Sequence, residues 1–216
     1  MVELTRQMLD GLPKNGPTDP IEYYRRPLVG RLFRNRINMG LRLLGTARYA
    51  RALEVGYGAG AVLLALAPAV SELHGIDLDA DPAPVTALLA QRGFSAKLAQ
   101  GNVYDLPYDD ASFDLVVCFS VFEHLHEFER GLAQVARILR PGGRFLLGMP
   151  AVNKMMEAGF RAIGFKGIND HHVTTPRAVS ASFQKIGLEV ASARTLDFPV
   201  KGVRLYYTWL LRKTDA

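Results

Sequence analysis

Residues 51–60 read RALEVGYGAG, a short apolar run that ends in three closely spaced glycines. Glycine permits a tight turn and lets the backbone approach a ligand, and the helix expected next, over 59–67, offers free N–H groups at its first turn. Asp77 ends the next apolar run, about 20 residues after Gly56, where a carboxylate can accept hydrogen bonds from ribose hydroxyls. A purely structural turn, with Asp77 as a helix cap, is the alternative. Loop, spacing and strand context together favour an adenosine-containing cofactor.

Strand-like and helix-like segments alternate after this turn. The expected strands are 51–56, 72–77, 95–100, 113–120 and 144–149, and the expected helices are 59–67, 83–93, 128–140, 151–163 and 175–185. This alternation is typical of βαβ units in a parallel sheet covered on both faces, so the expected fold class is α/β. Two later strand-like runs, 188–198 and 203–211, predict a hairpin at a sheet edge.

The chain before the first strand has two parts. Residues 1–20 contain three prolines and two glycines, and we expect an irregular or loosely docked lead-in. Residues 21–45 show a helical pattern with one polar face. That face holds Arg31, Arg34, Asn38 and Arg42. Arg36 lies off it, so the amphipathic pattern is imperfect.

Length and composition indicate one domain, since the chain has 216 residues of which 49% are hydrophobic. The one cysteine excludes an intramolecular disulfide framework and a thiolate zinc site. No secretory signal pattern opens the chain, and its longest clean apolar run, 61–70, is too short to cross a membrane. We expect a cytoplasmic protein that could bind a membrane peripherally. Its parts would be a helical cap (1–50), a cofactor-binding core (51–150), and substrate-side helices with C-terminal strands (151–216).

The net charge of +5 is unevenly distributed along the chain. Residues 1–22 carry −2, 23–53 carry +8, 54–129 carry −10 and 130–216 carry +9. A nucleic-acid-binding protein is typically basic along one whole face or stripe. The acidic middle segment therefore argues against nucleic acid as the partner.

The arginine-rich segment from Arg25 to Arg51 leaves three interpretations open. In the first, its arginines face solvent or pair with the acidic middle segment while its apolar side covers a cleft. In the second, Tyr23, Tyr24, Arg25 and Arg26 form a lid that recognises an anionic or lipid-like acceptor, with a contact to a membrane surface. In the third it binds RNA, although few aromatic residues are interleaved with its arginines.

The glycine loop alone does not identify the cofactor. Gly56, Gly58 and Ala61 formally satisfy the G-x-G-x-x-A pattern of a dinucleotide site, which would indicate an NAD(P)-dependent oxidoreductase. Glu54 argues against this, because a carboxylate is unfavourable beside a pyrophosphate and suits a cationic amino group. Gly60 also comes one position early for the third glycine of that pattern.

Six short motifs occur in the order seen in one enzyme family. They are Glu54–Gly60 (EVGYGAG), Gly75–Leu78 (GIDL), Leu106–Tyr108 (LPY), Phe113–Val117 (FDLVV), Phe122–Leu125 (FEHL) and Leu139–Arg144 (LRPGGR). On these motifs the chain resembles class I S-adenosylmethionine-dependent methyltransferases, in particular the small-molecule and lipid group called methyltransferase type 11. The resemblance is dense over 51–150 and weak over 170–190. It implies a Rossmann-like, doubly wound, mostly parallel seven-stranded sheet with an antiparallel C-terminal edge hairpin and an N-terminal helical cap.

The resemblance also implies how S-adenosylmethionine would be held at its methionine end. Glu54, Gly56, Gly58 and Gly60 would hold the methionine moiety, and Tyr57, at a position where a small residue is frequent, would narrow the pocket. Acidic residues at the strand ends would balance the ammonium and sulfonium charges.

The same resemblance places the rest of the cofactor. Asp77 would bind the ribose hydroxyls and Leu78 would pack on the adenine. Asn102 and Val103 match the position that usually contacts the adenine amino group, with Asn in place of the usual Asp. Phe119 would lie beside the methionine end.

Three histidines are candidates for a general base, which is needed only if the acceptor arrives protonated. His124 follows the fourth strand, where the resemblance places the acceptor side of the pocket. His171 and His172 lie in a polar turn that could fold over the same opening. Adjacent histidines seldom converge on one ion, so we predict no metal site.

The expected function is methyl transfer from S-adenosylmethionine to a small-molecule or lipid-like acceptor with an oxygen, nitrogen or carbon nucleophile. The alternatives are a non-catalytic S-adenosylmethionine-binding partner protein, an RNA methyltransferase and an NAD(P)-dependent oxidoreductase. Binding of S-adenosylhomocysteine or of NAD(P) separates the last alternative from the others.

Overall fold

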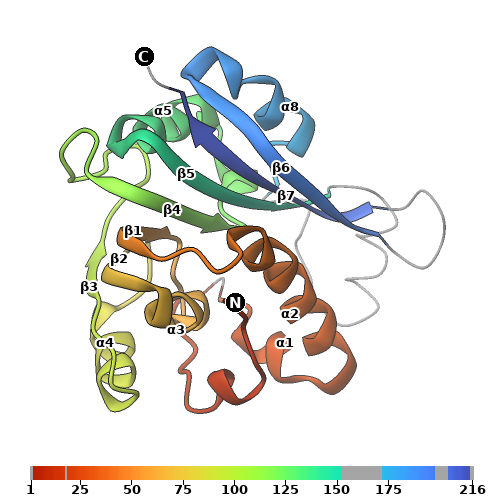
Figure 1. The fold of residues 1–216 in the computed structure, drawn as a ribbon. Coiled ribbons are helices and arrows are strands. Elements are labelled where there is room, and N and C mark those ends of the chain that lie inside the picture. Colours follow the sequence, from red (N-terminus) through yellow and green to blue (C-terminus); the bar gives the residue numbers. More distant parts are fainter. Residues whose placement is uncertain (1, 18, 152–171, 198–203, 215–216) are drawn as a thin grey trace.

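A seven-stranded mixed sheet forms the centre of the computed structural model, which describes residues 2–17, 19–151, 172–197 and 204–214 (Figure 1). The strands are β1 (Tyr49–Val55), β2 (Val70–Asp77), β3 (Lys97–Gln100), β4 (Phe113–Phe119), β5 (Leu139–Pro150), β6 (Leu188–Asp197) and β7 (Arg204–Lys213). Their order is β3-β2-β1-β4-β5-β7-β6. The pairs among β1 to β5 are parallel, and β7 runs antiparallel to both β5 and β6. The predicted α/β sheet with an antiparallel C-terminal edge is confirmed.

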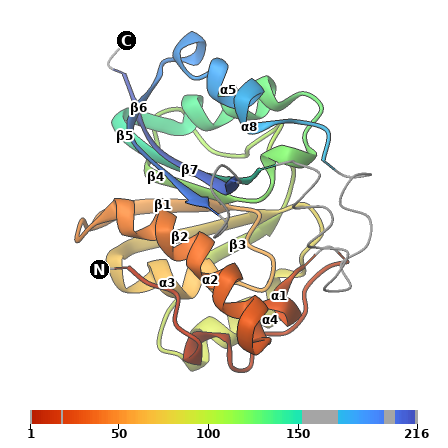
Figure 2. The ribbon, with the colours of Figure 1, turned by 90° about the vertical axis from the view of Figure 1, so that its right-hand side faces the viewer.

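Helices cover both faces of the sheet (Figure 2). One face carries α5 (Phe128–Ile138) and α8 (Pro176–Ala181), and the other carries α2 (Pro27–Leu41), α3 (Ala61–Leu66) and α4 (Pro82–Gln91). All residues of the central strand β4 are buried, as expected for a parallel strand covered on both sides. Within the described ranges, no helix is long and apolar enough to cross a bilayer.

The helix predicted over 21–45 is divided into α1 (Ile21–Arg25), α2 and a 3-10 turn at Arg42–Leu44, so the prediction of one helix is wrong. The break lies at Arg26, whose ψ of 142° is extended. A residue before proline is disfavoured in the helical region, and Pro27 begins α2 where no N–H donor is needed. The chain therefore turns a corner between α1 and α2.

Other predicted boundaries differ by a few residues. Strand β5 begins at Leu139, so it includes the last two residues of the predicted helix and residues 141–143, which were expected to separate helix from strand. The predicted helix 175–185 consists of α8 and a 3-10 turn at Gln184–Ile186. The predicted helix 151–163, apart from Ala151, and the turn at 199–202 lie outside the described residues.

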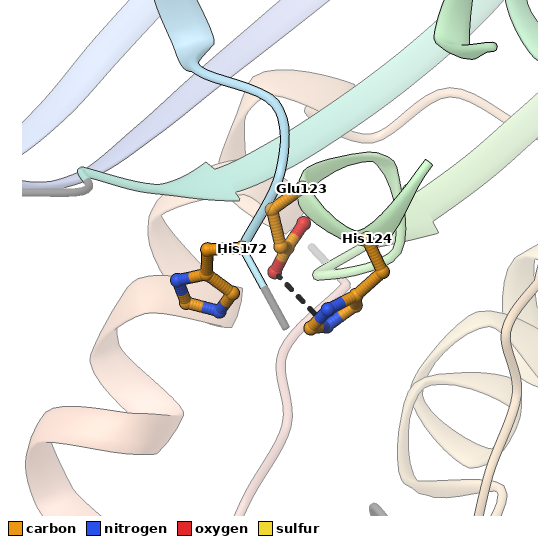
Figure 3. A group of neighbouring side chains, drawn as sticks. All are labelled: Glu123, His124 and His172. Carbon is orange, nitrogen blue, oxygen red and sulfur yellow. Dashed lines mark ion pairs between the residues drawn. The ribbon is translucent and has the colours of Figure 1, made fainter. Parts of the chain in front are cut away.

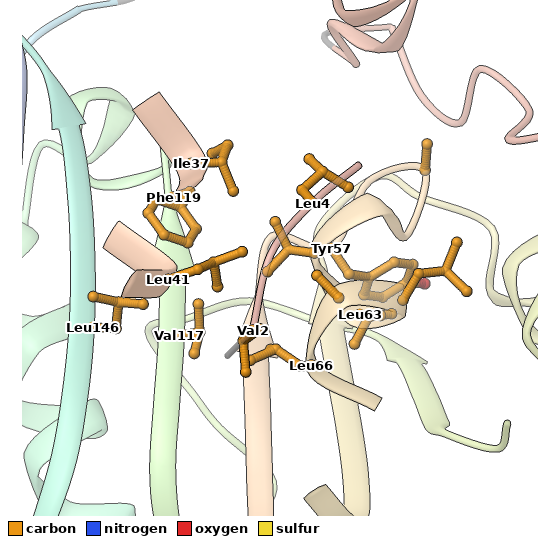
Figure 4. Close-up of a cluster of buried hydrophobic side chains, with 14 of the residues drawn as sticks. Val2, Leu4, Ile37, Leu41, Tyr57, Leu63, Leu66, Val117, Phe119 and Leu146 are labelled. Atoms are coloured by element: carbon orange, nitrogen blue, oxygen red, sulfur yellow. The ribbon is translucent and has the colours of Figure 1, made fainter. Parts of the chain in front are cut away.

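The lead-in is firmly docked, contrary to the expectation of loose docking. Leu4, Leu9 and Leu12 are buried in the core on the α2–α3 face of the sheet, and Figure 4 shows Leu4 beside residues of α2, α3 and β4. Asn38, predicted on the polar face of its helix, is buried as well. Its Oδ1 accepts from the Leu4 N–H at 2.7 Å and its Nδ2 donates to the Leu4 carbonyl at 3.0 Å. The amide thus pairs with the backbone of the lead-in.

The strand order places a switch point at the middle of the sheet. β1 has β2 on one side and β4 on the other, so successive βαβ units extend in opposite directions. In open α/β sheets a crevice forms outside the carboxyl ends of the strands at such a point, and ligands bind there. The glycine loop after β1 and the FEHL motif after β4 both lie at this crevice.

Candidate active site

A cleft of about 790 Å³ opens at the carboxyl ends of β1, β2 and β4. Its walls come from distant parts of the chain: the lead-in, α1, α2, the glycine loop, the residues after β4, and His172. The volume is typical of small-molecule and cofactor sites. The predicted cofactor residues other than Gly60 line one part of the cleft, and two of the three predicted histidines line another.

The glycine loop has a backbone that glycine adopts far more readily than other residues. Gly56 and Gly58 have φ values of 79° and 47°, in the left-handed region. A Cβ atom on Gly56 would also come within 2.4 Å of the Val121 side chain. The loop therefore needs glycine both for its conformation and for its contact with the segment after β4.

Asp77 is held in place at the end of β2 by three backbone donors. Its Oδ2 accepts from the Gly58 N–H at 2.9 Å, and its Oδ1 accepts from the N–H groups of Asp79 and Ala80, both at 2.9 Å. The carboxylate lines the cleft with its orientation determined before any ligand arrives. Oδ2 accepts only one of these bonds, so it has a second lone pair that can accept from a ribose hydroxyl.

The predicted adenine residues lie next to Asp77 on the same wall. Leu78 is 60% exposed and offers an apolar surface to the cleft. Asn102 is exposed at the cleft, and its Oδ1 accepts from the Tyr104 N–H at 3.0 Å. Val103 is buried behind it. The structure thus brings together the side chains to which the resemblance assigns the adenosine moiety.

Glu54 is the buried carboxyl group at the other end of this wall. It is 3% exposed, and its Oε2 atom has no hydrogen-bond partner among the described residues. Burial, followed by the negative charge of Asp77, raises the pKa of Glu54 well above its usual value. An unpartnered buried oxygen is costly, and an ammonium group bound beside it would donate to it and favour the ionised form. Glu54 therefore fits the amino group of a methionine-derived cofactor.

Tyr57 and Phe119 line the cleft but mainly support its walls. The Tyr57 ring packs against Gly75, and its hydroxyl donates to the Ala80 carbonyl at 3.2 Å. The Phe119 ring fits between Gly40 and Gly148, where a Cβ atom on either glycine would lie less than 3 Å from it. Both aromatic residues line the cleft, and their roles toward the cofactor stay predictions.

The lead-in supplies two cleft residues that the sequence did not indicate, Asn15 and Asp19. Asn15 donates to the carbonyls of Gly58 and Asp81 at 3.0 and 2.9 Å, and accepts from the Asp81 N–H at 2.9 Å. Asp19 accepts from the backbone N–H groups of Asn15 and Ile21, and burial raises its pKa. The Asn15-Gly16-Pro17 sequence indicates a turn, but nothing local indicates what that turn contacts.

The corner between α1 and α2 forms the opposite wall. Tyr23 and Tyr24 line the cleft, as the lid interpretation of this segment requires. Arg25 does not line it: its guanidinium donates to the carbonyls of Leu9 and Leu12 in the lead-in. The arginines proposed for the lid are thus in part structural.

A second cluster of polar side chains lies after β4, where Glu123, His124 and His172 meet (Figure 3). His124 Nε2 lies 4.0 Å from Glu123 Oε1, and the two imidazole rings have their centroids 5.2 Å apart. The His172 backbone is separated from His124 by nearly 50 residues of sequence, and the N–H groups of Val173 and Thr174 donate to the Glu123 carbonyl at 2.8 and 3.1 Å. His171 lies outside the described residues.

Glu123 is the member of this cluster that the sequence did not single out, although it adjoins His124 in the FEHL motif. Its side chain is 1% exposed, and its Oε2 has no partner in the described part of the chain. Burial raises the pKa of Glu123 to about 8, even though the positive charge of Arg36 lowers it. At neutral pH this carboxyl group is therefore mostly protonated.

Glu123, His124 and His172 also have the composition of a metal-ligand set, with their donor atoms within 4.8 Å of one another. Such a set would need the Glu123 carboxylate ionised, and the nearby guanidinium of Arg36 disfavours a dication there. The prediction of no metal site stays a prediction.

Comparison with known proteins agrees with this geometry. A family model described as "Methyltransferase domain" matches residues 53–147. The chain is 36% identical over 99 residues to the "Uncharacterized methyltransferase YcgJ" of Bacillus subtilis, covering 45% of this chain and 39% of that protein. It is 35% identical over 99 residues to a "Fatty-acid O-methyltransferase" of Mycolicibacterium smegmatis, covering 44% and 35%. The chain thus matches about two-fifths of the length of such curated relatives.

A solved structure extends the likeness to nearly the whole chain, at the level of the fold. The N-methyltransferase NodS from Bradyrhizobium japonicum, in complex with S-adenosyl-L-homocysteine, has a TM-score of 0.68 and 22% identity, covering 99% of this chain and 100% of that one. Residues 53–147 thus match a methyltransferase domain model, and the chain shares its fold with a solved methyltransferase structure.

Proposed function

We propose that the chain binds S-adenosylmethionine in this cleft and transfers its methyl group to a small-molecule or lipid-like acceptor. The observation that carries the cofactor assignment is Glu54, a buried carboxyl group with an unpartnered oxygen beside the glycine loop. Such a group attracts an ammonium and repels a pyrophosphate, which favours this cofactor over NAD(P). The fatty-acid O-methyltransferase among the relatives supports the lipid-like class of acceptor.

The bound cofactor supplies a methyl group already activated on a sulfonium sulfur, so the protein's task is alignment and exclusion of water. Asp77, held by three N–H donors, orients the ribose. The lead-in, through Asn15, holds the glycine loop from outside and shields it from solvent. The α1–α2 corner closes the acceptor side with Tyr23 and Tyr24.

His124 is our candidate for the group that accepts a proton from the acceptor. Its side chain is 41% exposed at the cleft, with Nε2 directed to the Glu123 carboxyl group. Glu123 orients the ring, and His172, whose ring centroid lies 5.2 Å from that of His124, is the second candidate. His171 remains a candidate from the sequence alone.

Isothermal titration calorimetry with S-adenosylhomocysteine tests the cofactor assignment. We expect saturable binding, and we expect Glu54→Gln to weaken it by about tenfold or more, because a hydrogen bond to a charged group is lost. Glu189→Gln is the matched control, since Glu189 is an exposed carboxylate of β6 that pairs with Arg212 outside the cleft. Absence of saturable binding, or thermal stabilisation by NAD(P) and not by S-adenosylhomocysteine, would contradict the proposal.

A further inference from the structure

Arg36 is a charged residue in the apolar wall of the cleft. It lies on α2 off the helix's polar face, and its guanidinium is surrounded by aromatic rings. The Cζ atom is 4.4 Å from the ring centroid of Phe33, 5.3 Å from that of Tyr206 and 5.7 Å from that of Tyr24. These rings stabilise the guanidinium by cation–π attraction, but they are neutral and do not act as a counter-ion.

The hydrogen bonds of this guanidinium are incomplete among the described residues. Nη2 donates to the Tyr24 hydroxyl at 3.2 Å, whereas the buried Nε–H has no acceptor there. Arg36 also forms no ion pair with any carboxylate in the described ranges. Glu123 influences it electrostatically, but that carboxyl group is mostly protonated at neutral pH. A guanidinium with a buried, unused donor and no counter-ion is costly unless a ligand supplies the anion.

The position of Arg36 connects two spaces. It lines the main cleft together with Tyr24, Glu123 and His124, and it also lines a separate small cavity of about 40 Å³. The other walls of that cavity are mostly apolar, with Leu32, Pro150, Leu196 and Leu205. A ligand that reaches Arg36 therefore contacts one cationic group within a largely apolar and aromatic surface.

We propose that Arg36 binds a carboxylate of the methyl acceptor, so that the acceptor is an organic acid with an apolar body. This inference rests on the proposed methyltransferase function and specifies its substrate class. The Nε–H and an adjacent Nη–H form a planar pair of donors that matches the two oxygens of a carboxylate. The aromatic walls would contact the apolar body of the acid. Because Arg36 and His124 line the same cleft, an acid bound by Arg36 would lie in the part of the cleft that we propose for the acceptor.

The test measures binding of decanoate to the full chain, saturated with S-adenosylhomocysteine, by isothermal titration calorimetry. Decan-1-ol and decyl phosphate are compared with it, because the alcohol has the same chain without charge and the phosphate carries a different anion. We expect decanoate to bind at least about tenfold more tightly than decan-1-ol and more tightly than decyl phosphate. Arg36→Gln should abolish the preference for the acid, and Arg36→Lys should retain only part of it because lysine lacks the planar pair of donors.

Arg31→Gln is the matched control, since Arg31 lies exposed on the same helix and does not line the cleft. It should leave the preference for decanoate unchanged. Equal affinity of the wild type for acid and alcohol, tighter binding of decyl phosphate, or a preference that survives in Arg36→Gln would each overturn the proposal. Binding of S-adenosylhomocysteine is measured for every variant. If Arg36→Gln alone no longer binds S-adenosylhomocysteine, that variant is misfolded. The preference of Arg36→Lys for decanoate over decan-1-ol, compared with that of the wild type, then tests the proposal. Absence of S-adenosylhomocysteine binding in the wild type would refute the methyltransferase function itself.

Discussion

Two buried carboxyl groups, Glu54 and Glu123, distinguish the walls of the cleft from the rest of the core. Each has an oxygen without a partner in the part of the chain that the structure describes, and burial raises the pKa of both. A protein gains no stability from such groups, because the desolvation is not compensated by hydrogen bonds. Their presence is best explained by ligands that complete their bonding, an ammonium at Glu54 and the acceptor with its proton near Glu123.

The raised pKa of Glu123 predicts a specific dependence of stability on pH. The folded-state pKa of about 8 lies above the usual value of 4.5. Between these two pH values the folded protein therefore binds more protons than the unfolded protein, and its free energy of unfolding falls as the pH rises. Glu123→Gln removes this loss. The free energy of unfolding of the variant, relative to wild type, should therefore rise between pH 5 and pH 9 by a few kcal/mol, as measured by urea denaturation. A difference that does not change with pH would show that Glu123 is ionised in the folded state.

The absence of a metal at Glu123, His124 and His172 is a second prediction at this scale. Treatment with EDTA, or addition of Zn²⁺ or Mg²⁺, should change neither the melting temperature nor the affinity for S-adenosylhomocysteine, because Arg36 and a protonated Glu123 disfavour a dication. Differential scanning fluorimetry with and without each ion checks this. Stabilisation by Zn²⁺ in the wild type that disappears in His172→Ala would establish a metal site instead.

The α1–α2 corner is the element that positions the acceptor side of the cleft. Pro27 ends α1 and begins α2, and Gly30 allows the Tyr24 carbonyl to approach the second helix closely. Arg34 Nη1 donates to that carbonyl at 2.7 Å, so an arginine predicted on the polar face of the helix stabilises the corner. The corner in turn places Tyr24 next to Arg36.

Gly30→Ala should destabilise the protein, the reverse of its usual effect in a helix. Alanine in place of a helical glycine ordinarily stabilises by about 1 kcal/mol. Here the added Cβ would lie 2.1 Å from the Tyr24 carbonyl oxygen, so the corner must open. We expect a net loss of about 1–3 kcal/mol in urea denaturation. Arg31→Ala, on an exposed position of the same helix, should change stability by less than about 0.5 kcal/mol. A gain in stability for Gly30→Ala would show that the corner is not held as described.

At the scale of the molecule, one cleft is assembled from segments that are remote in sequence. The sheet brings together the carboxyl ends of β1, β2 and β4, and the lead-in and α2 complete the opposite wall. Asn15 connects the lead-in to two of these segments. Its side chain forms hydrogen bonds with Gly58 in the glycine loop and with Asp81 at the start of α4.

Asn15→Ala should therefore weaken cofactor binding without direct contact with the cofactor. Loss of its three hydrogen bonds should destabilise the protein by about 1–3 kcal/mol and raise the dissociation constant of S-adenosylhomocysteine severalfold, since the glycine loop loses its external support. Calorimetry and urea denaturation measure the two effects. Asn35→Ala, an exposed asparagine of α2, serves as the control. Unchanged affinity in Asn15→Ala would mean that the lead-in plays no part in the cofactor site.

Most of the fold and the cofactor half of the cleft could be predicted from the sequence. The alternation of apolar strands and helices, the glycines with left-handed φ, and Asp77 at a strand end are local requirements of backbone geometry, so they are visible in short stretches. Pro27 also indicates a division of the helix, although the helical periodicity continues on either side of it.

The half of the cleft that we propose for the acceptor depends on contacts that no short stretch of sequence contains. Arg36 is off the polar face of its helix in sequence, but its burial against Tyr206 depends on a strand at the far end of the chain. Likewise Asn15 and Asp19 acquire their roles by docking on the glycine loop, and Glu123 by the approach of His172. Such contacts join residues about 40 to 170 positions apart. A local sequence pattern indicates the periodicity of one helix or strand but not the element that it packs against, so these contacts could not be predicted. Local sequence patterns are thus sufficient for the sheet and the glycine turn, whereas the charge and shape of the opposite wall of the cleft result from long-range packing.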